Sequence, residues 1–522
     1  MDNNKTYTNL NDIPDELFTF TQKDDRIFNK KFETKPIGYF KDAWLRFKKN
    51  KASIAAAIII AVILLFGIIA PFFASYKISD SDGVYAKVRP YNPLFAGLGI
   101  HFWDGSYVKT LNDKYQIYLT GIGAGAEDKD GSGVSYEEGI NSKWSPIVSE
   151  GIAYDRDGSR YRDSRIDSYK LVGFKYQNIT LSKYEEIRAY EEATGLQILY
   201  PMVDTTNEWC DTYNADDANF WYRHAANSSP VDGNGRKMTL EDVMEKGFVD
   251  NYVRDSEGNV KYYVAKDKNM IQVRVLYYNY FIYLNGYEPL HTFGADAQGY
   301  DILVRLAHGI RLSFILAICV SFINLLIGAV YGAIEGYYGG WVDMIMERIS
   351  DIISGLPFII VAALFQLHLV NTGKVSTLVG LLFAFVTTGW IGMAYRVRTQ
   401  FYRFKNQEYI LAARTLGARD LRLIFKHIFP NALGTIITTA SLIIPGVIFT
   451  ESILSYLGIV NFNGASQTSI GTMLSNGQGY LATDPHIILF PSIVISLLMI
   501  SFNLLGNGLR DAFNPTLRGA QE

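Results

Sequence analysis

Residues 408–431 read Glu408-Tyr-Ile-Leu-Ala-Ala-Arg-Thr-Leu-Gly417-Ala-Arg-Asp-Leu-Arg-Leu-Ile-Phe-Lys-His-Ile-Phe-Pro430-Asn. Ala413 and Gly417 are four apart, so a helix places both small residues on one face, where another protein's backbone can approach closely. Gly417 can also end a helix without the steric cost of a Cβ. A second helical stretch is expected at 420–428, and Pro430 is expected to end it. The pattern predicts a short helix-turn-helix that docks another protein at a membrane surface; the alternative is a solvated basic loop that only sets orientation.

Apolar segments on both sides of this stretch indicate six membrane spans. Residues 54–73 carry no charge and are long enough to cross a hydrocarbon core of ~30 Å. The charged stretch before them is too long for a signal peptide. Five further apolar segments are expected to span at 312–334, 344–367, 375–395, 433–457 and 487–505. Pro357 and Pro445 lie inside two of these segments and predict bends, which membrane helices tolerate.

Basic residues at the ends of the spans set the predicted orientation. They gather before the first span, between the fourth and fifth, and after the sixth. Six spans place all three clusters on the cytoplasmic side, with both termini. Residues 76–296 and 459–486 are then outside. Four carboxylates flank or enter the third span, and we expect Asp351 to lie deepest among Glu335, Asp343, Glu347 and Asp351.

The segment 76–296 differs in composition from the rest of the chain, with 24 basic and 33 acidic residues. Strands are predicted at 261–265 and 271–278, with a turn at 255–259. A helix is predicted at 181–194, capped by Ser182 and ended by Gly195. These signals indicate an α+β domain large enough to bury its own core.

Other motifs give little evidence of catalysis or metal binding. No Walker A motif occurs, so ATP is expected to bind a separate subunit. No basic stripe interleaved with aromatic residues suggests nucleic acid. The segment 128–139 resembles a calcium loop, but position 12 is a glycine where a bidentate Glu belongs. A polar turn is the alternative; the calcium ligands would be Asp128, Asp130, Ser132 and the backbone of Val134.

The stretch 408–431 resembles the EAA loop of ABC importer permeases, which reads Glu-Ala-Ala, three residues, Gly, nine residues, Ile-x-Leu-Pro. The spacing is intact, and the matching residues are Ala412, Ala413, Gly417 and Pro430. The chain departs from the pattern at Leu411, where the family has Glu, and at His427 and Phe429, where it has Ile and Leu. In the family this loop inserts into a groove of the ATP-hydrolysing subunit. The resemblance implies a coupling helix built from Ala412, Ala413, Arg414, Gly417, Ala418, Arg419, Asp420 and Pro430.

Four further stretches resemble the C-type permease of oligopeptide, dipeptide and nickel importers. They are Ala43-Trp-Leu-Arg-Phe-Lys-Lys-Asn-Lys-Ala-Ser, Phe293-Gly-Ala-Asp-Ala-Gln-Gly-Tyr-Asp-Ile-Leu-Val-Arg-Leu-Ala-His-Gly-Ile-Arg, Gly336-Tyr-Tyr-Gly-Gly-Trp-Val-Asp and Asn503-Leu-Leu-Gly-Asn-Gly-Leu-Arg-Asp. The resemblance covers 35–75 and 290–520, and in that family the link between the first two spans is usually short. It implies the type I importer fold and four kinds of partner: a homologous second permease subunit, two ATP-binding subunits that hold ATP and Mg²⁺, an extracellular substrate-binding lipoprotein, and a peptide substrate.

The expected organisation is therefore a polytopic α-helical protein of the plasma membrane with an inserted extracellular α+β domain. Its parts are a cytoplasmic segment at 1–53, a first transmembrane helix at 54–75, the extracellular domain at 76–296, a five-helix permease core at 297–510 with the EAA loop at 396–431, and a cytoplasmic tail at 511–522. The expected function is transport and not catalysis. The alternatives are a permease for nickel or another small solute, and a membrane-anchored surface receptor or enzyme.

Overall fold

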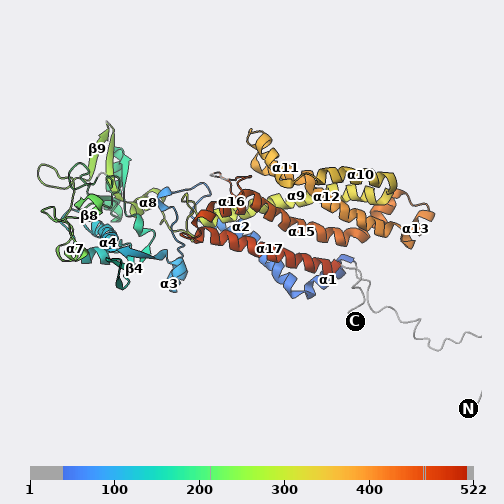
Figure 1. Ribbon diagram of the computed structural model, residues 1–522, viewed down its shortest axis with the longest axis horizontal. Helices are drawn as coiled ribbons and strands as arrows, with labels where there is room; N and C mark the ends of the chain where they lie inside the picture. The colour runs from blue at the N-terminus through green and yellow to red at the C-terminus, as the bar shows by residue number, and fades with distance from the viewer. Residues whose placement is uncertain (1–38, 212, 268, 463, 465, 514–522) are drawn as a thin grey trace, which may run out of the picture.

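The computed structural model describes residues 39–211, 213–267, 269–462, 464 and 466–513. Figure 1 shows an elongated molecule in which a long bundle of helices carries a mixed part of helices and strands at one end. The mixed part is formed by the chain between α2 (Lys51–Phe73) and α9 (Ile302–Tyr338), and we call residues 74–301 the insertion. Residues 1–38 of the cytoplasmic segment expected at 1–53 and residues 514–522 of the tail expected at 511–522 lie outside the described residues.

Within the described part of the chain, five helical runs are long and apolar enough to cross a membrane. They are α2, α9, α12 (Thr377–Lys405), the run Asp420–Tyr456 that ends in α15 (Phe429–Tyr456), and α17 (His486–Phe513). Among the shorter helices before or between these runs are α1 (Tyr39–Lys49) and α16 (Ile470–Gly477). α9 has 37 residues, roughly 55 Å at 1.5 Å per residue. It therefore extends well beyond the predicted segment 312–334 and beyond a hydrocarbon core of ~30 Å.

The third predicted span is not one helix. α10 (Gly340–Ser354) is followed by α11 (Phe358–Phe365) and a π-helical turn (Gln366–Val370), and the two parts are bent by 71°. The break falls on Gly355, Leu356 and Pro357. The residue before a proline disfavours the α conformation, and proline has no N–H to donate. The expectation of a single bent helix over 344–367 is therefore wrong, because Pro357 separates two helices.

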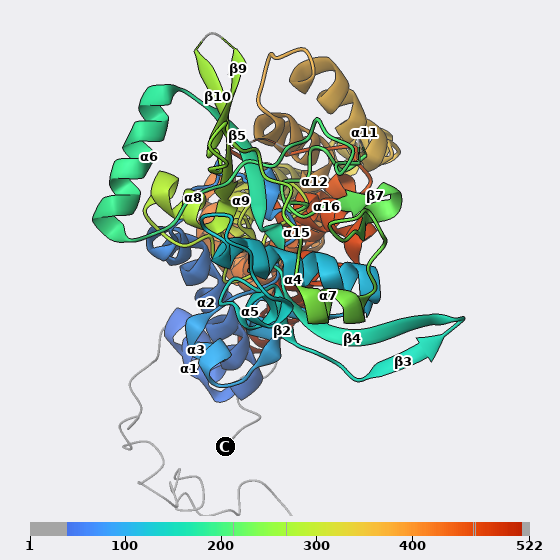
Figure 2. The same cartoon turned by 90° about the vertical axis from the view of Figure 1, so that its left-hand side faces the viewer.

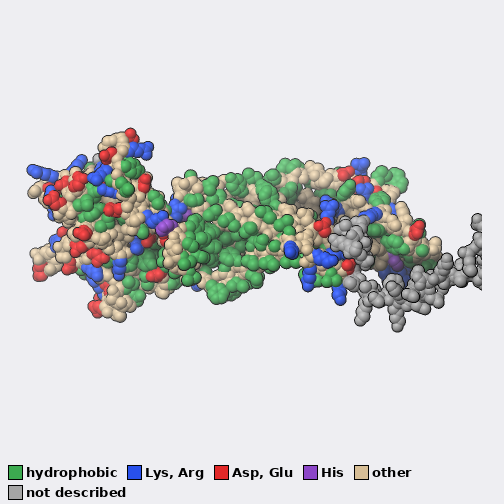
Figure 3. All heavy atoms as spheres, turned by 90° about the horizontal axis from the view of Figure 1, so that it is seen from below, with side chains coloured by type: hydrophobic (Ala, Val, Ile, Leu, Met, Phe, Trp, Pro, Cys, Tyr) green, Lys and Arg blue, Asp and Glu red, His purple; other side chains and the backbone are tan. Residues whose placement is uncertain are grey.

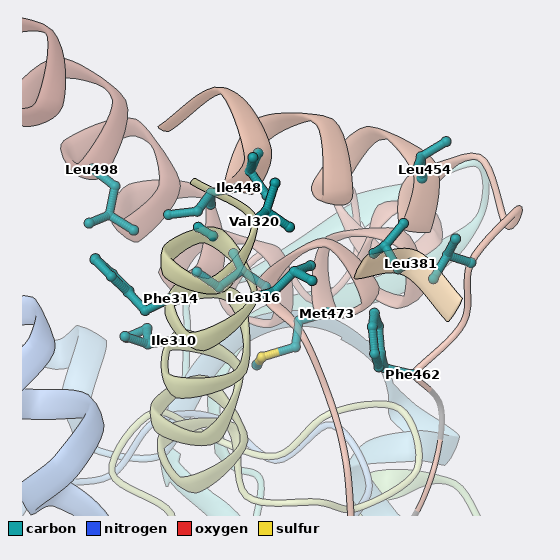
Figure 4. Packing of buried hydrophobic residues seen from close by; sticks show 14 of the residues in the cluster. Ile310, Phe314, Leu316, Val320, Leu381, Ile448, Leu454, Phe462, Met473 and Leu498 are labelled. Carbon is teal, nitrogen blue, oxygen red and sulfur yellow. The ribbon is translucent and has the colours of Figure 1, made fainter. Parts of the chain in front are cut away.

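The core of the helical part is built around α9. Figure 4 shows apolar side chains of this helix pointing toward residues from several other helices. On α9 these are Ile310, Phe314, Leu316 and Val320, and around them lie Leu381, Ile448, Leu454, Phe462, Met473 and Leu498. Figure 3 shows that hydrophobic side chains cover most of the visible flank of the bundle, with charged ones gathered toward its two ends. This distribution is typical of a protein that crosses a bilayer.

The insertion contains two four-stranded antiparallel sheets. In the first sheet β1 (Ser106–Asn112), β4 (Ser159–Asp167) and β2 (Ile147–Ser149) lie in that order, and β3 (Ala153–Arg156) pairs with β4. In the second, β5 (Phe174–Ile179), β10 (Met270–Leu276) and β6 (Leu199–Tyr200) lie in that order, and β9 (Tyr263–Asp267) pairs with β10. A two-stranded pair is formed by β7 (His224–Ala225) and β8 (Ser229–Pro230). The predicted strands are found as β9 and β10, shifted by one or two residues.

The insertion also contains α-helices that lie beside these sheets (Figure 2). They are α3 (Pro93–Gly97), α4 (Asp113–Glu127), α5 (Tyr136–Asn141), α6 (Leu181–Thr194), α7 (Leu240–Lys246) and α8 (Tyr277–Asn285). α6 has the predicted bounds and ends at Gly195, which has φ +72°. Its N-cap is Thr180 and not Ser182, since the Lys183 N–H donates to the Thr180 Oγ1 at 3.2 Å. Either hydroxyl suits an N-cap, and the actual start of the helix decides between them.

The insertion is fastened to the helical part near the start of α17. The rings of Phe293 and Phe490 stack with centroids 4.1 Å apart. Arg89 donates from Nη2 to the Thr483 carbonyl at 2.7 Å, and the same nitrogen lies 3.3 Å from the Asp484 carboxylate. The insertion therefore packs directly on the bundle through apolar and charged contacts.

Candidate functional site: the 408–428 coupling element

The first arm of the predicted docking element is a short helix with a well-defined end. α13 (Glu408–Thr415) is capped by Leu416, and Gly417 follows with φ +84°. The Gly417 N–H donates to the Arg414 carbonyl at 3.0 Å and the Ala418 N–H to the Ala413 carbonyl at 3.1 Å. This pair of hydrogen bonds is the Schellman motif, in which a left-handed residue, usually glycine, ends a helix. The prediction that Gly417 ends the first helix is confirmed.

The second arm runs into the membrane helix without a break. α14 (Asp420–Arg422) continues as a π-helical segment (Leu423–Ile428) and then as α15. The Phe429 N–H donates to the Ile424 carbonyl, which lies five residues back. A π-helical turn widens the helix just before Pro430, whose ring would otherwise meet the carbonyl four residues earlier. The expectation that Pro430 ends this helix is therefore wrong.

One face of the coupling element (residues 408–428) is buried against the bundle. Four apolar side chains from both arms are buried, namely Ile410, Leu423, Ile424 and Ile428. They share a hydrophobic cluster with Val397 and Phe401 of α12 and with Tyr337 at the end of α9. Their burial fixes both arms to two of the long helices, so a displacement of the element displaces those helices as well.

Polar contacts add a second attachment to α9. The Tyr337 hydroxyl donates to Asp420 Oδ1 at 2.5 Å and accepts from Arg414 Nη2 at 3.3 Å. One phenol therefore joins the two arms across the Gly417 turn. Nearby, Lys405 Nζ donates to the Gly336 carbonyl at 3.0 Å. Hydrogen bonds that involve a charged group are the stronger ones, so Tyr337 is a principal link between the element and α9.

The opposite face of the coupling element is exposed. Gly417 is exposed as predicted, and Ala412 is exposed as well, whereas Ala413, predicted to share the open face with Gly417, is half-buried, as is Ala418. Large apolar side chains are exposed beside them, above all Leu416 at 88% and Leu421 at 70%, together with Phe425. Contiguous exposed apolar side chains rimmed by charges mark interaction surfaces. The rim here is basic and is formed by Arg414, Arg419, Arg422 and Lys426.

A charge cluster lies at the same end of the bundle and ties α10 to α9 and α12. Arg398 of α12 donates from Nε to Asp343 at 2.6 Å and from Nη1 to Glu347 at 2.9 Å, and it lies 3.6 Å from Glu335 of α9. Glu335 is the most buried carboxylate of the four singled out in the sequence, at 4% exposure. Asp351, expected to lie deepest, is exposed and pairs with Arg348 at 3.0 Å. α10 runs along the surface of the bundle, with none of its side chains buried, and the expected depth of Asp351 in the membrane stays a prediction.

Sequence reasoning missed the roles of Tyr337 and Arg398. Both lie in stretches that it had noted, Tyr337 in the Gly336-Tyr-Tyr-Gly-Gly-Trp-Val-Asp motif and Arg398 among the basic residues used for orientation. Their partners are 83 and 55 residues away in sequence. No local periodicity indicates such pairs, so only the fold identifies them.

A second buried carboxylate lies elsewhere in the bundle. Glu451 of α15 is fully buried and accepts hydrogen bonds from Ser313 of α9 at 3.1 Å and from Ser455 at 2.9 Å. A buried carboxylate needs such partners. Glu451 therefore joins α9 to α15 and stabilises the contact between these helices.

The calcium-loop segment folds as a turn followed by α5. Asp128 is buried, and burial raises the pKa of its carboxyl, whereas Asp130 is exposed and accepts from the Ser132 N–H at 3.1 Å. Glu138 forms a capping box with Ser135. Across the described residues, no group of three or more His, Cys, Asp and Glu is placed to hold a metal ion. The geometry gives the calcium hypothesis no support.

Comparisons with known proteins place the chain in a family. Residues 324–519 match the model of the binding-protein-dependent transport system inner membrane component, and residues 38–92 match the N-terminal TM domain of oligopeptide transport permease C. The insertion beyond residue 92 lies outside both matches.

Individual relatives agree with these matches. The oligopeptide transport system permease protein OppC of Bacillus subtilis is 44% identical over 44% of this chain and 72% of its own length. The dipeptide transport system permease protein DppC of the same organism is 41% identical over 44% of this chain and 69% of its own. A solved inward-facing conformation of the MetNI methionine ABC transporter is 16% identical, covers 40% of this chain and 96% of that chain, and has a TM-score of 0.34. The chain therefore belongs to the membrane permeases of binding-protein-dependent ABC importers, in the oligopeptide permease C family.

Proposed function

We propose that this chain forms half of the membrane passage of an ATP-driven peptide importer. Relatives named for oligopeptide and dipeptide transport support peptides as the substrate. The complete transporter adds a homologous second permease subunit, two ATP-binding subunits and an extracellular substrate-binding lipoprotein. The chain itself is a transport subunit, and ATP hydrolysis belongs to the separate ATP-binding subunits.

The observation that carries this proposal is the two-sided construction of the coupling element. Its exposed face offers a flat turn at Gly417 beside Leu416 and Leu421 to a partner, while its buried face holds α9 and α12. When the ATP-binding subunits close, they move residues 412–420, and the buried contacts pass that movement to the two helices. The helices then exchange outward-facing and inward-facing arrangements, which requires a bistable packing. The docking residues in this proposal are Ala412, Ala413, Arg414, Gly417, Ala418, Arg419, Asp420 and Pro430.

The proposed topology has six spans, with α10 and α11 together forming the third. Both termini and the coupling element are cytoplasmic, and the insertion is extracellular. The three basic clusters on one side support this orientation. The position of the insertion over the start of α17 supports a role in docking or guiding the substrate-binding lipoprotein. A collar without contact to that lipoprotein is the competing role, and it predicts unchanged lipoprotein association after the insertion is deleted.

Gly417→Leu tests the coupling assignment. No heavy atom other than its chain neighbours lies within 4 Å of a Cβ added at Gly417, so the new side chain projects into open space, where we place the ATP-binding subunit. The matched control is Gly373→Leu at the opposite end of α12, because Gly373 has φ +73° and a similarly open surrounding. Both variants place an L residue in the left-handed region at a cost of about 1–2 kcal/mol. The backbone strain is therefore similar in the two variants, and they differ in where the new side chain lies.

We expect Gly417→Leu to insert normally and to abolish most ATP-driven peptide uptake, and Gly373→Leu to retain it. Reconstituted transporter with labelled tripeptide is the assay, and nickel uptake measured in parallel addresses the small-solute alternative. Normal uptake in the Gly417→Leu variant would refute the docking assignment. Nickel uptake without peptide uptake by the unmodified transporter would overturn the substrate assignment.

A further inference from the structure

The insertion carries a groove that transport through the bundle does not explain. It has a volume of about 670 Å³, within the range typical of small-molecule sites. Its walls come from β1, α4, β4 and the segment 217–228, and in Figure 2 α4 and β4 lie on the side of the insertion that faces away from the bundle. The lining residues used below are Lys109, Lys114, Tyr115, Tyr118, Asp217 and Phe220.

Aromatic rings in contact with one another form one wall of the groove. Tyr115 and Tyr118 stack with an angle of 12° and centroids 5.7 Å apart. Phe220 continues the row, with its centroid 4.8 Å from that of Tyr118. Such a row offers an extended apolar and π surface to a ligand backbone or side chain.

A cation lies against the Tyr115 end of the row, and a carboxylate lies against its middle ring, Tyr118. Lys109 Nζ lies 4.4 Å from the Tyr115 ring centroid and 3.3 Å from the Tyr115 hydroxyl, and Lys114 also lines the groove. Asp217 Oδ2 accepts from the Tyr118 hydroxyl at 2.8 Å. Burial and the neighbouring Asp217 raise the pKa of the Tyr118 phenol, which keeps that phenol a hydrogen-bond donor.

These charges are not neutralised within the protein. Of the ion pairs that the described residues form, none includes Lys109, Lys114 or Asp217. Asp217 Oδ1 is held by the Asn219 N–H at 3.0 Å, so its carboxylate has a fixed direction. A groove with two cations and an oriented anion that form no ion pair among the described residues, together with aromatic rings, is complementary to a ligand that carries one charge of each sign at its two ends.

We propose that this groove binds a short peptide with free termini, its α-carboxylate near Lys109 and Lys114 and its α-ammonium near Asp217. The choice of a peptide among zwitterions rests on the proposed transport function. An extended peptide advances about 3.3–3.6 Å per residue, so two or three residues match a row of two stacked tyrosines and one phenylalanine. The insertion then concentrates substrate outside the membrane, independently of the lipoprotein.

Equilibrium binding to the assembled transporter in nanodiscs, without lipoprotein and without ATP, tests this proposal. The probe is labelled Ala-Phe-Ala, compared with its N-acetylated, C-amidated form. We expect saturable binding of the free tripeptide and binding about tenfold weaker for the blocked form, because charge-assisted hydrogen bonds are lost. Lys114→Ala and Asp217→Asn are each expected to weaken binding of the free tripeptide several-fold. Asp217→Asn is also expected to reduce the difference in binding between the free and the blocked tripeptide, and Lys129→Ala, at an exposed lysine of the insertion outside the groove, is expected to change nothing.

Absence of saturable binding, equal binding of the free and blocked peptides, or binding that the groove variants leave unchanged would each overturn the proposal. The last result would place the peptide in the membrane passage instead. ATP-driven uptake with lipoprotein, measured on the same preparations, separates this outcome from failure of the transport function: uptake by a transporter that lacks groove binding contradicts the groove alone.

Discussion

The two ends of α9 are anchored in different ways. At the insertion end, Asp301 caps the helix by accepting from the Val304 N–H at 2.8 Å and also contacts His291 Nδ1 at 2.9 Å. The His291 and Asp301 side chains are only 2% and 5% exposed. At the other end, Tyr337 holds an element whose far face is open to solvent. The first end is closed within this chain, whereas the second leaves apolar side chains exposed, and there we propose that a partner docks.

Asp301→Ala tests the insertion end of α9 and should lower the stability of the protein most among the variants below. It removes the N-cap of α9 and leaves a buried histidine without its hydrogen-bond partner, a loss of roughly 1.5–5 kcal/mol. The insertion should detach from the bundle and melt earlier, which limited proteolysis and thermal unfolding of the detergent-solubilised permease can measure. Asp301→Asn retains a capping oxygen and should lose less. If both variants melt like the unmodified protein, the insertion end of α9 is not the closed anchor described above.

Arg398→Ala tests the charge cluster at the opposite end of the bundle. The change leaves Glu335, Asp343 and Glu347 together without their shared cation, which we expect to lower the stability of the α10 attachment by about 3 kcal/mol. Protease sensitivity around 340–354 reports on that attachment. Arg396→Ala is the matched control, because Arg396 is exposed two residues earlier on the same helix. Equal protease sensitivity of the two variants would contradict the role of the cluster.

Tyr337→Phe should have a smaller effect on stability and a specific effect on coupling. It removes one hydroxyl that donates to Asp420 and accepts from Arg414, contacts worth about 1.5–3 kcal/mol with charged groups. The apolar contacts of the ring remain, so the ATP-binding subunits should still assemble. We expect the number of ATP molecules hydrolysed for each imported peptide to rise several-fold. The neighbouring Tyr338→Phe serves as the control, and the same rise in both variants would count against Tyr337 as the link.

The presence or absence of calcium should change the stability of the permease least. Asp128 is buried, Asp130 is exposed and Glu138 is held by Ser135, so we expect no calcium binding by these three carboxylates. Adding calcium or a chelator should leave the melting temperature of the permease unchanged. A calcium-dependent rise in the melting temperature that is lost in Asp130→Ala would instead support calcium binding by this loop.

Local sequence predicted the features that depend on local chemistry. The length of the apolar, mostly uncharged segments indicates the membrane spans. The turn at Gly417 follows from the freedom of glycine to adopt positive φ. Leu356 and Pro357 show the limit of such reasoning, since a proline in an apolar run permits either a bend or a break, and packing decides. Pro430 shows the reverse case, because a π-helical turn accommodates the proline. The contacts of Tyr337 and Arg398 depend on which helices become neighbours, which local patterns do not contain.

Cross-linking from residue 416 tests the central claim most directly. Leu416→Cys is introduced with Cys210→Ser and Cys319→Ser, and Leu98→Cys, exposed on the insertion, is the control. In the assembled transporter a short thiol-to-amine reagent should link residue 416 to an ATP-binding subunit, with a yield that changes when ATP is bound, and should not link residue 98 to it. Absence of a link from residue 416 in an intact, ATP-hydrolysing complex would contradict the account, because the coupling element would then have no partner.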